Sequence, residues 1–224
     1  MGMFIALEGL DGSGKSTVAE RLVRVFCAAG LDAMLTREPG GTNLGEQIRS
    51  MLLSEESTTI VPRAEALLFA AARAQLVDEV IRPALERGVI VVTDRFTDSS
   101  LAYQWGGRGL DKDGIDAVQL VATAGLEPDT KVLLDLPVEM ALRRRLNHEG
   151  QVNRLDKETI QFHARVRDAY HWLAEADPVR WHVVDASASE DQVWADVSRA
   201  VNVKGLSAAG TRSLREKPSR KVVG

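Results

Sequence analysis

The stretch Gly9-Leu10-Asp11-Gly12-Ser13-Gly14-Lys15-Ser16 matches the pattern G-x-x-x-x-G-K-[ST], which is typical of a loop that wraps phosphate groups. It follows the apolar run Met3–Leu7 and precedes Thr17–Ala29, where apolar residues recur at helical spacing. Glycines and a helix N-terminus direct backbone N–H groups and partial positive charge at phosphate oxygens. These flanks argue against a chance glycine-rich turn. We therefore expect Lys15 to reach the outer phosphates and the Ser16 hydroxyl to ligate Mg²⁺.

Length and composition favour one cytoplasmic domain, or a domain with a lid. The chain has 224 residues, 45% of them hydrophobic, and a net charge of −4, which is no general footprint for nucleic acid. No apolar run approaches the roughly 20 residues of a membrane span, and the chain begins with an expected strand rather than a signal peptide. The single cysteine, Cys27, excludes a disulfide framework and is expected to be buried on the first helix.

Short apolar runs alternate with longer amphipathic segments along the chain. Further strands are expected at 33–36, 89–93, 131–135 and 181–185, and helices at 44–53, 63–87, 112–124, 138–147, 156–175 and 190–201. This alternation predicts an α/β fold with a parallel sheet covered by helices on both faces. In such sheets ligands bind beyond the carboxyl ends of the strands.

The chain divides into a large body and a short basic segment. We expect a domain over 1–202, with a lid at about 143–156, and a disordered tail over 203–224. The tail carries six basic residues and one acidic residue, without apolar periodicity. It is either a solvated tail without a role or a contact for nucleic acid or a partner.

Charged residues follow the second expected strand. Arg37 and Glu38 are placed at the mouth of the site by the strand direction, and Pro39-Gly40-Gly41 forces a tight turn. Arg49 follows on the next helix. The alternative is a surface turn in which Arg37 and Glu38 form a solvated ion pair.

The third expected strand ends in Asp94 and Arg95. Asp94 can orient Mg²⁺ through water, and the planar fork of Arg95 suits a phosphate monoester. The helix beyond carries polar side chains that can read a small ligand, although Asp98 or Ser99 could instead cap that helix; the set is Asp98, Ser99, Ser100, Tyr103 and Gln104.

Three further groups are candidates for binding. Asp11, inside the loop, can bind a substrate hydroxyl, steer Mg²⁺ or merely cap the loop. Phe69 and Arg73 lie four residues apart on one helix face, which suits a stacked nucleobase with a guanidinium donor, although a phenylalanine is usually core. The polar stretch after Arg143-Arg144-Arg145, as far as Asp156, predicts a lid that excludes water, with a solvated helix face as the alternative.

These stretches together resemble the bacterial thymidylate kinases, which phosphorylate dTMP with ATP. The resemblance covers about residues 3–202 and is most specific at Glu8–Thr17, Thr36–Thr42 and Asp94–Gln104. It implies a P-loop three-layer αβα sandwich with a five-stranded parallel sheet, a small helical lid, a homodimer and Mg²⁺, with ATP and dTMP as substrates and neither nucleic acid nor membrane as partner.

The resemblance also implies roles for individual residues. Arg95 would hold the dTMP phosphate with Arg37 nearby, Phe69 would stack on thymine, and Arg73 would donate to the carbonyl at position 4. Tyr103 would crowd the 2′ position, and Asp11 would lie near the 3′-hydroxyl and the metal. The implied catalytic residues are Lys15, Asp11, Arg95 and Arg154, and the metal residues are Ser16 and Asp94. The implied ATP-binding residues are Gly9, Leu10, Asp11, Gly12, Ser13, Gly14, Lys15, Ser16, Thr17 and Arg145, and the dTMP-binding residues are Asp11, Arg37, Glu38, Arg49, Phe69, Arg73, Arg95, Ser99, Ser100, Tyr103 and Gln104.

The chain departs from the family pattern in three places. Trp105 stands before Gly106-Gly107, where it could narrow the pocket rim or reshape the dimer edge. Asn147 and Glu149 stand where further lid arginines are expected. The phosphate loop has no arginine, so the cation on the moving phosphoryl group must come from Arg143–Arg145 or from Arg154, which sits in the best-matched stretch.

Two competing functions remain open at this point. Another P-loop kinase, acting on a different nucleoside monophosphate, would keep the phosphate loop and change the base-reading set. A nucleotide-dependent switch would carry an Asn-Lys-x-Asp stretch for guanine, which the sequence does not contain.

Overall fold

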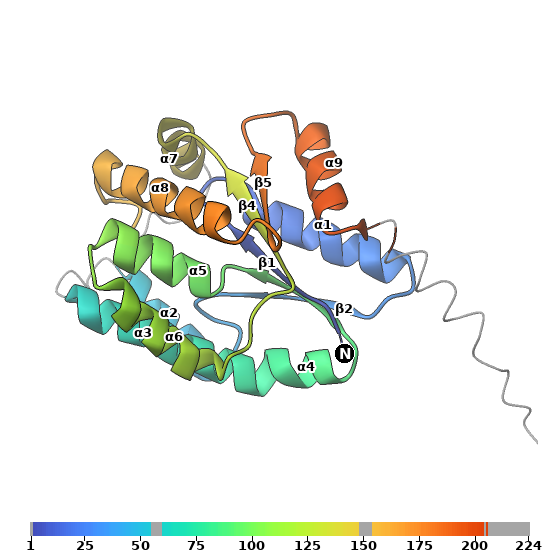
Figure 1. Cartoon of the computed structure of the whole chain (residues 1–224), viewed down its shortest axis with the longest axis horizontal. Coiled ribbons are helices and arrows are strands. Elements are labelled where there is room, and N and C mark those ends of the chain that lie inside the picture. Colours follow the sequence, from blue (N-terminus) through green and yellow to red (C-terminus); the bar gives the residue numbers. More distant parts are fainter. Residues whose placement is uncertain (1, 55–59, 148–153, 204, 206–224) are drawn as a thin grey trace, which may run out of the picture.

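The computed structural model describes residues 2–54, 60–147, 154–203 and 205. Across these residues the five strands form one all-parallel sheet in the order β2-β3-β1-β4-β5 (Figure 1). This confirms the predicted fold class. The strands are β1 Phe4–Glu8, β2 Ala33–Arg37, β3 Ile90–Asp94, β4 Thr130–Asp135 and β5 Trp181–Asp185.

Helices cover both faces of the sheet. Helices α1 and α9 pack on one face and α4 and α8 on the other (Figure 1), and no described helix is long and apolar enough to cross a membrane. The helices are α1 Lys15–Ala28, α2 Asn43–Leu53, α3 Pro62–Leu76, α4 Arg82–Glu86, α5 Thr97–Ser100, α6 Lys112–Thr123, α7 Val138–Asn147, α8 Ile160–Ala176 and α9 Glu190–Ala200, with π-helical turns η1 Val77–Ile81 and η2 Leu101–Gly107.

The central strand β1 shows why the sheet is buried on both faces. Its side chains alternate between two clusters, as strand geometry requires. Leu7 packs in the cluster that contains Phe26 of α1, whereas Phe4 packs in the cluster that contains Leu76 and Ile81. The carboxyl end of β1 therefore emerges between two filled layers, at the point where the phosphate loop begins.

The helix predicted over 63–87 is interrupted by a π-helical turn. Pro83 has no N–H for an α-helical bond to the carbonyl of residue 79, and its ring would collide with that carbonyl. The chain widens to η1 just before it, where the N–H of Arg82 donates to the carbonyl of Val77. The prediction placed the helical segment correctly and missed this turn.

The second π-helical turn, η2, packs unusually close to α8. A Cβ added at Gly107 would lie 2.5 Å from the Phe162 ring, and one added at Gly106 would lie 2.5 Å from the Cβ of Ala169. Neither glycine therefore has room for a side chain. This close packing holds the segment that follows Arg95 against α8.

Two sequence expectations are wrong at the level of packing. Cys27 is exposed, because it lies about 100° around the helix from the buried Phe26 rather than on its face. Val203 is buried in the main cluster, so the body extends past the predicted boundary at 202. Apart from Val203 and Gly205, the predicted tail lies outside the described residues.

We expect Gly107→Ala to lower the free energy of unfolding by about 1–3 kcal/mol, the usual cost of overpacking. Gly114→Ala is the control, because this exposed helical glycine has Asp111 Oδ2 as its nearest neighbour, at 3.2 Å. Urea unfolding measures both variants. Equal stability of the two would show that η2 and α8 are not in tight contact.

Candidate active site

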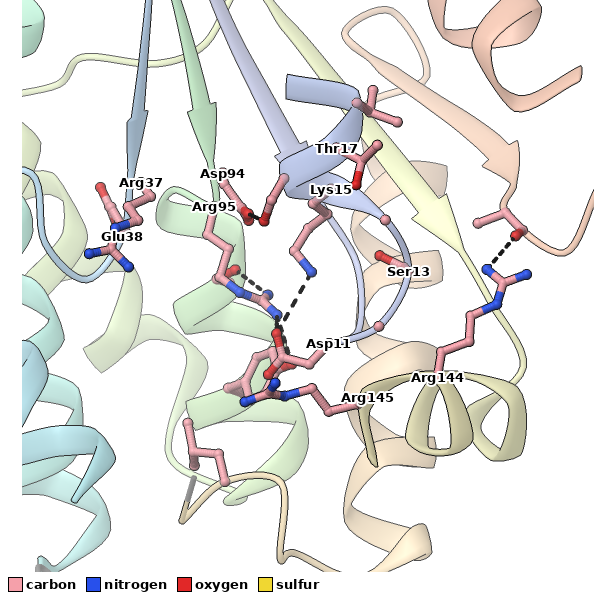
Figure 2. Close-up of a pocket in the computed structure, with 18 of the residues that line it drawn as sticks. Asp11, Ser13, Lys15, Thr17, Arg37, Glu38, Asp94, Arg95, Arg144 and Arg145 are labelled. Atoms are coloured by element: carbon pink, nitrogen blue, oxygen red, sulfur yellow. Dashed lines mark hydrogen bonds and ion pairs between the residues drawn. The ribbon is translucent and has the colours of Figure 1, made fainter. Parts of the chain in front are cut away.

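A cavity of about 1280 Å³ opens at the carboxyl ends of β1, β2 and β3. Phe69 and Gln104 line one part of it, Val193 and Trp194 line another, and the phosphate loop contributes residues 11–17. Figure 2 shows the loop between Arg37 on one side and Arg144 on the other. The cavity therefore offers space on both sides of the loop, as a reaction between two ligands requires.

The phosphate loop has the geometry that its sequence predicts. Gly12 has a φ of 84°, and a side chain there would collide with the carbonyl of Ala141. Lys15 is 5% exposed, and its Nζ donates to the carbonyl of Leu10 at 2.9 Å. Burial lowers the pKa of Lys15. Gly9 and Leu10 are not among the residues that line the cavity, whereas Asp11 to Thr17 are.

Ser16 and Asp94 meet at the base of the loop. The Ser16 hydroxyl donates to Asp94 Oδ2 at 2.7 Å, which brings together a hydroxyl and a carboxylate from α1 and β3. Oxygen donors of this kind, completed by phosphate oxygens and water, suit Mg²⁺. No larger cluster of acidic, histidine or cysteine side chains suited to a metal occurs within the described part of the chain.

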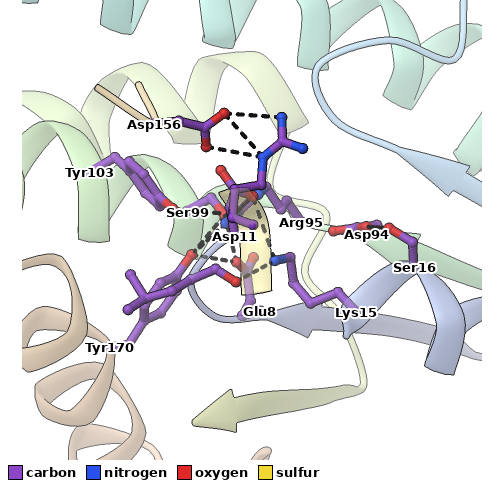
Figure 3. A network of polar contacts seen from close by, with 12 residues as sticks. Glu8, Asp11, Lys15, Ser16, Asp94, Arg95, Ser99, Tyr103, Asp156 and Tyr170 are labelled. Carbon is purple, nitrogen blue, oxygen red and sulfur yellow. Dashed lines mark hydrogen bonds and ion pairs between the residues drawn. The ribbon is translucent and has the colours of Figure 1, made fainter. Parts of the chain in front are cut away.

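Four side chains accept hydrogen bonds from the guanidinium of Arg95 (Figure 3). Its Nη1 donates to Ser99 Oγ at 3.0 Å and to Tyr170 Oη at 3.1 Å, and its Nη2 donates to Asp11 Oδ1 at 2.7 Å and to Tyr103 Oη at 3.2 Å. These bonds leave the Nε–H without an acceptor among the described residues. The site thus presents a rigid guanidinium that is 13% exposed.

Asp11 is bound to cations rather than to the loop backbone. Its carboxylate contacts Arg95, and Lys15 Nζ lies 3.8 Å away. Burial by itself would raise the pKa of Asp11, but the nearby Arg95, Lys15 and Arg145 cations outweigh it and hold the pKa well below its usual range. Asp11 is therefore a fixed negative charge, and the loop-capping alternative is wrong.

Glu8 lies fully buried behind Arg95, at the end of β1. It accepts hydrogen bonds from the Phe96 N–H at 2.7 Å and from the hydroxyls of Ser99 and Tyr170 at 2.6 and 2.8 Å. Burial, reinforced by the Asp98 carboxylate and opposed by Arg95, raises the pKa of Glu8 to about 7.

Arg73 is 1% exposed, and the protein uses most of its donors. Nε donates to Glu38 Oε2 at 2.7 Å, Nη2 donates to the carbonyl of Phe96 at 2.9 Å, and Nη1 donates to both Ser100 Oγ and Gln119 Oε1. Nη2 also lies 2.5 Å from Glu38 Oε2, so each N–H of the guanidinium has an acceptor nearby. Phe69 lines the cavity beside it while packing against the small cluster of Ile48, Leu52 and Ala72.

Arg37, at the end of β2, and Glu38, just after it, do not form the solvated ion pair that was the alternative interpretation of this turn. Glu38 is buried on Arg73, whereas Arg37 contacts Glu46 through both carboxylate oxygens at 3.1 Å. Arg49 donates to the carbonyl of Pro39 at 2.9 Å. Arg37, Glu38 and Arg49 all line the cavity, as predicted from their position after the strand.

The lid arginines divide into two groups. Arg144 and Arg145 line the cavity; Arg145 contacts Asp156, and Arg144 donates to the carbonyl of Ala186. Arg154 does not line it, because its guanidinium is held by Glu65. The structure therefore does not bring Arg154 to the phosphates as expected. Residues 148–153 of the predicted lid, including Glu149, lie outside the described residues.

Three other interpretations are corrected by the geometry. Asp98 caps no helix and forms a buried ion pair with Lys131, while Ser99 bonds to Glu8 rather than to a helix end. Trp105 does not line the cavity and packs edge-on against Trp172, 5.1 Å between ring centroids.

Sequence reasoning missed several residues that shape the site. Glu8 could have been found, because it is the charged end of an otherwise apolar buried strand. Tyr170, Glu65 and Gln119 sit in amphipathic helices without any local motif. Glu65 accepts from Gln104 at 3.1 Å, and Arg21 stacks on Trp194 at 4.3 Å, at opposite sides of the cavity.

Comparison with known proteins gives one consistent family. The family model described as thymidylate kinase matches residues 7–197. The chain is 49% identical to the thymidylate kinase of Thermomicrobium roseum over 205 residues, which cover 90% of this chain and 97% of that protein. It is 47% identical to the thymidylate kinase of Nitratidesulfovibrio vulgaris, covering 89% and 95%, and 46% identical to that of Deinococcus radiodurans, covering 91% and 98%.

We expect the wild type to lose stability relative to Glu8→Gln as the pH rises from about 4.5 to 7. Over this window the folded protein retains a proton that the unfolded chain has already released, so its stabilising effect disappears as the pH passes the raised pKa. The difference in unfolding free energy should change by on the order of 3 kcal/mol. Denaturant unfolding at several pH values measures it, and parallel pH curves for the two proteins would contradict the raised pKa.

Proposed function

The chain belongs to the thymidylate kinase family and phosphorylates dTMP with ATP, and we propose that the acceptor phosphate binds at Arg95. The observation that carries this assignment is the guanidinium itself, which is held rigidly beside the phosphate loop and lines the cavity. A guanidinium fork matches the oxygens of a phosphate monoester. Incoming phosphate would engage Nε and share or replace the contacts of Nη2.

The base of dTMP belongs in the part of the cavity lined by Phe69, Ser100 and Gln104. The Phe69 ring offers a stacking plane. Arg73 would donate to the carbonyl at position 4 by sharing an N–H of Nη2 with Glu38 or Phe96, and it holds the hydroxyl of Ser100. Tyr103, which is bonded to Arg95, would crowd a 2′-hydroxyl on the sugar. Arg37, Glu38, Arg49 and Ser99 complete the acceptor side.

The ATP phosphates belong in the loop, with Lys15 and Arg145 as the cations. Lys15 is buried, and Arg145 lines the cavity. Arg145 takes the role expected of Arg154 at the phosphates, because Glu65 holds the Arg154 guanidinium. Ser16 and Asp94 would hold Mg²⁺, which when bound neutralises charge on the donor phosphates. Arg21 and Trp194 stand on the far side of the loop, where the base of ATP would lie.

The reaction needs positioning and charge neutralisation rather than a strong base. The acceptor phosphate oxygen is already anionic and attacks the γ-phosphorus in line, while the β–γ bridging oxygen leaves with ADP. Arg95 fixes the acceptor, and Lys15 with Arg145 offsets the charge on the transferred group. Asp11 lies between Arg95 and Lys15, and its negative charge offsets their mutual repulsion before the phosphates bind.

A second copy of the chain is the partner that the exposed surface favours. Large apolar side chains are exposed on neighbouring helices, at Met51 of α2, Leu67 of α3, and Leu120 and Val121 of α6. Apolar surface of this kind is stabilised when two copies bury it against each other. Sedimentation velocity tests the dimer.

We place the enzyme in the cytoplasm with its nucleotide substrates, and we assign no role to nucleic acid.

An assay of ADP release with dTMP, dUMP, dCMP, dGMP and AMP as acceptors tests the substrate assignment. Turnover should be highest with dTMP. A preference for a purine monophosphate would favour the alternative, another P-loop nucleoside monophosphate kinase.

Lys15→Ala should fold and should lower kcat by roughly 10²–10³, because one charge on the transferred group is no longer offset. Steady-state kinetics and a melting curve measure the two effects. Retention of more than about a third of the activity would remove Lys15 from this role.

Arg95→Ala should lower the affinity for dTMP at least about tenfold, since a charge-assisted contact is worth about 1.5–3 kcal/mol. The affinity for ATP should stay nearly unchanged. Calorimetric titration with each nucleotide measures both affinities. Equal losses for dTMP and ATP would place Arg95 outside the acceptor site.

A further inference from the structure

Three side chains from three different elements close a ring behind Arg95 (Figure 3). Glu8 ends β1, Ser99 lies in α5 and Tyr170 lies in α8. The Ser99 and Tyr170 oxygens are 2.9 Å apart, both contact Glu8 Oε2, and both accept from Arg95 Nη1. The ring thus faces the side of the guanidinium opposite Asp11.

Every hydrogen-bonding proton of this ring finds an acceptor within the ring only when residue 8 carries a carboxyl group. Five contacts join Nη1, the two hydroxyls and Oε2. When Glu8 is ionised, the two Nη1 protons and the two hydroxyl protons fill four of them. When Glu8 is protonated, its own proton fills the fifth. In either state both hydroxyl oxygens remain acceptors for Arg95.

An amide at position 8 does not fit. Glu8 Oε1 accepts the Phe96 N–H at 2.7 Å, so a glutamine would keep its oxygen there and turn its NH₂ toward the hydroxyls. The ring would then hold one proton more than it has contacts, in a buried setting where an unpaired donor is costly. One hydroxyl proton would then have no acceptor within the ring.

The backbone of Arg95 depends on the same carboxylate. Arg95 has a φ of 77°, in the left-handed region that a side chain disfavours. Its N–H donates to the carbonyl of Leu7 at 2.9 Å, and the next N–H, that of Phe96, donates to Glu8. Glu8 therefore anchors both the chain that carries Arg95 and the hydroxyls that receive its side chain.

We propose that Glu8 and Tyr170 are positioning residues of the kinase, which together with Ser99 aim the Arg95 guanidinium at the acceptor phosphate without touching it. This inference rests on the proposed function in one respect, the binding of that phosphate by Arg95. It also assigns different roles to the nitrogen atoms of the Arg95 side chain. Nη1 is committed to the ring, so recognition is left to Nε and Nη2.

The test compares Tyr170→Phe and Glu8→Gln with the wild type, using the full chain and calorimetric titration of dTMP and of ADP separately. Both variants should bind dTMP about tenfold or more weakly, as expected for a lost hydrogen bond to a charged group, with ADP affinity within about twofold. The conservative Glu8→Asp should recover part of the loss that Glu8→Gln causes, because it restores an acceptor. Tyr170→Phe keeps the measurement open if Glu8→Gln fails to fold.

Asp135→Asn is the matched structural control. Asp135 also binds α8, through Arg167 at 2.7 Å and His171 at 3.1 Å, but it does not contact the ring. This variant should lower the melting temperature by about as much as Tyr170→Phe while keeping dTMP affinity within about twofold. An equal loss of dTMP affinity in Asp135→Asn would reduce Tyr170 to a structural role.

A double-mutant cycle separates this inference from the proposed function. If Tyr170 acts through Arg95, Arg95→Ala combined with Tyr170→Phe should bind dTMP within about twofold of Arg95→Ala alone. Additive losses would overturn the inference. If Arg95→Ala weakens dTMP binding while Tyr170→Phe and Glu8→Gln do not, the positioning role is wrong and the assignment of the acceptor site to Arg95 stands. If Arg95→Ala itself has no effect, the acceptor site fails and the positioning role fails with it.

Discussion

The positive charge of Arg95, taken out of water at the carboxyl end of β3, is the constraint on which the rest of the site depends. A buried guanidinium is stable only when nearly all its donors are satisfied and an anion lies close by. Here Ser99, Tyr170, Tyr103 and Asp11 supply the acceptors. Glu8, behind the two hydroxyls, is coupled to the same charge. Burial raises its pKa, while Arg95 lowers it.

Asp11 connects two cations of the cavity. Its carboxylate contacts Arg95 and lies near the loop lysine, Lys15, and a third cation, Arg145, holds its pKa down further. Substrates bring additional negative charge into this space, so the cations must be shared between Asp11 and the phosphates. Before substrate binds, Asp11 therefore offsets part of the positive charge that faces this space.

Most of the fold and the phosphate chemistry could be predicted from the sequence, because they depend on local patterns. The loop Gly9–Ser16 and the alternation of strands with helices are both local signals. The placement of Asp94 and Arg95 followed from strand direction alone. What could not be predicted depends on contacts between distant residues: Tyr170 reaches Glu8 across 162 positions, and Glu65 removes Arg154 from the cavity across 89. No pattern within α8 marks Tyr170, and none near Arg154 marks Glu65. The burial expected for Cys27 was wrong, because this residue lies one position along the helix from the buried Phe26.

A crystal structure of the enzyme with dTMP and ADP would test the central claim most directly. We expect a dTMP phosphate oxygen within hydrogen-bond distance of Nε or Nη2 of Arg95, while Nη1 keeps its contacts to Ser99 and Tyr170. We also expect the distance between Arg95 Nη2 and the Asp11 carboxylate to lengthen. A phosphate bound elsewhere in the cavity, or an Arg95 side chain that leaves Ser99 and Tyr170 in order to reach dTMP, would contradict it.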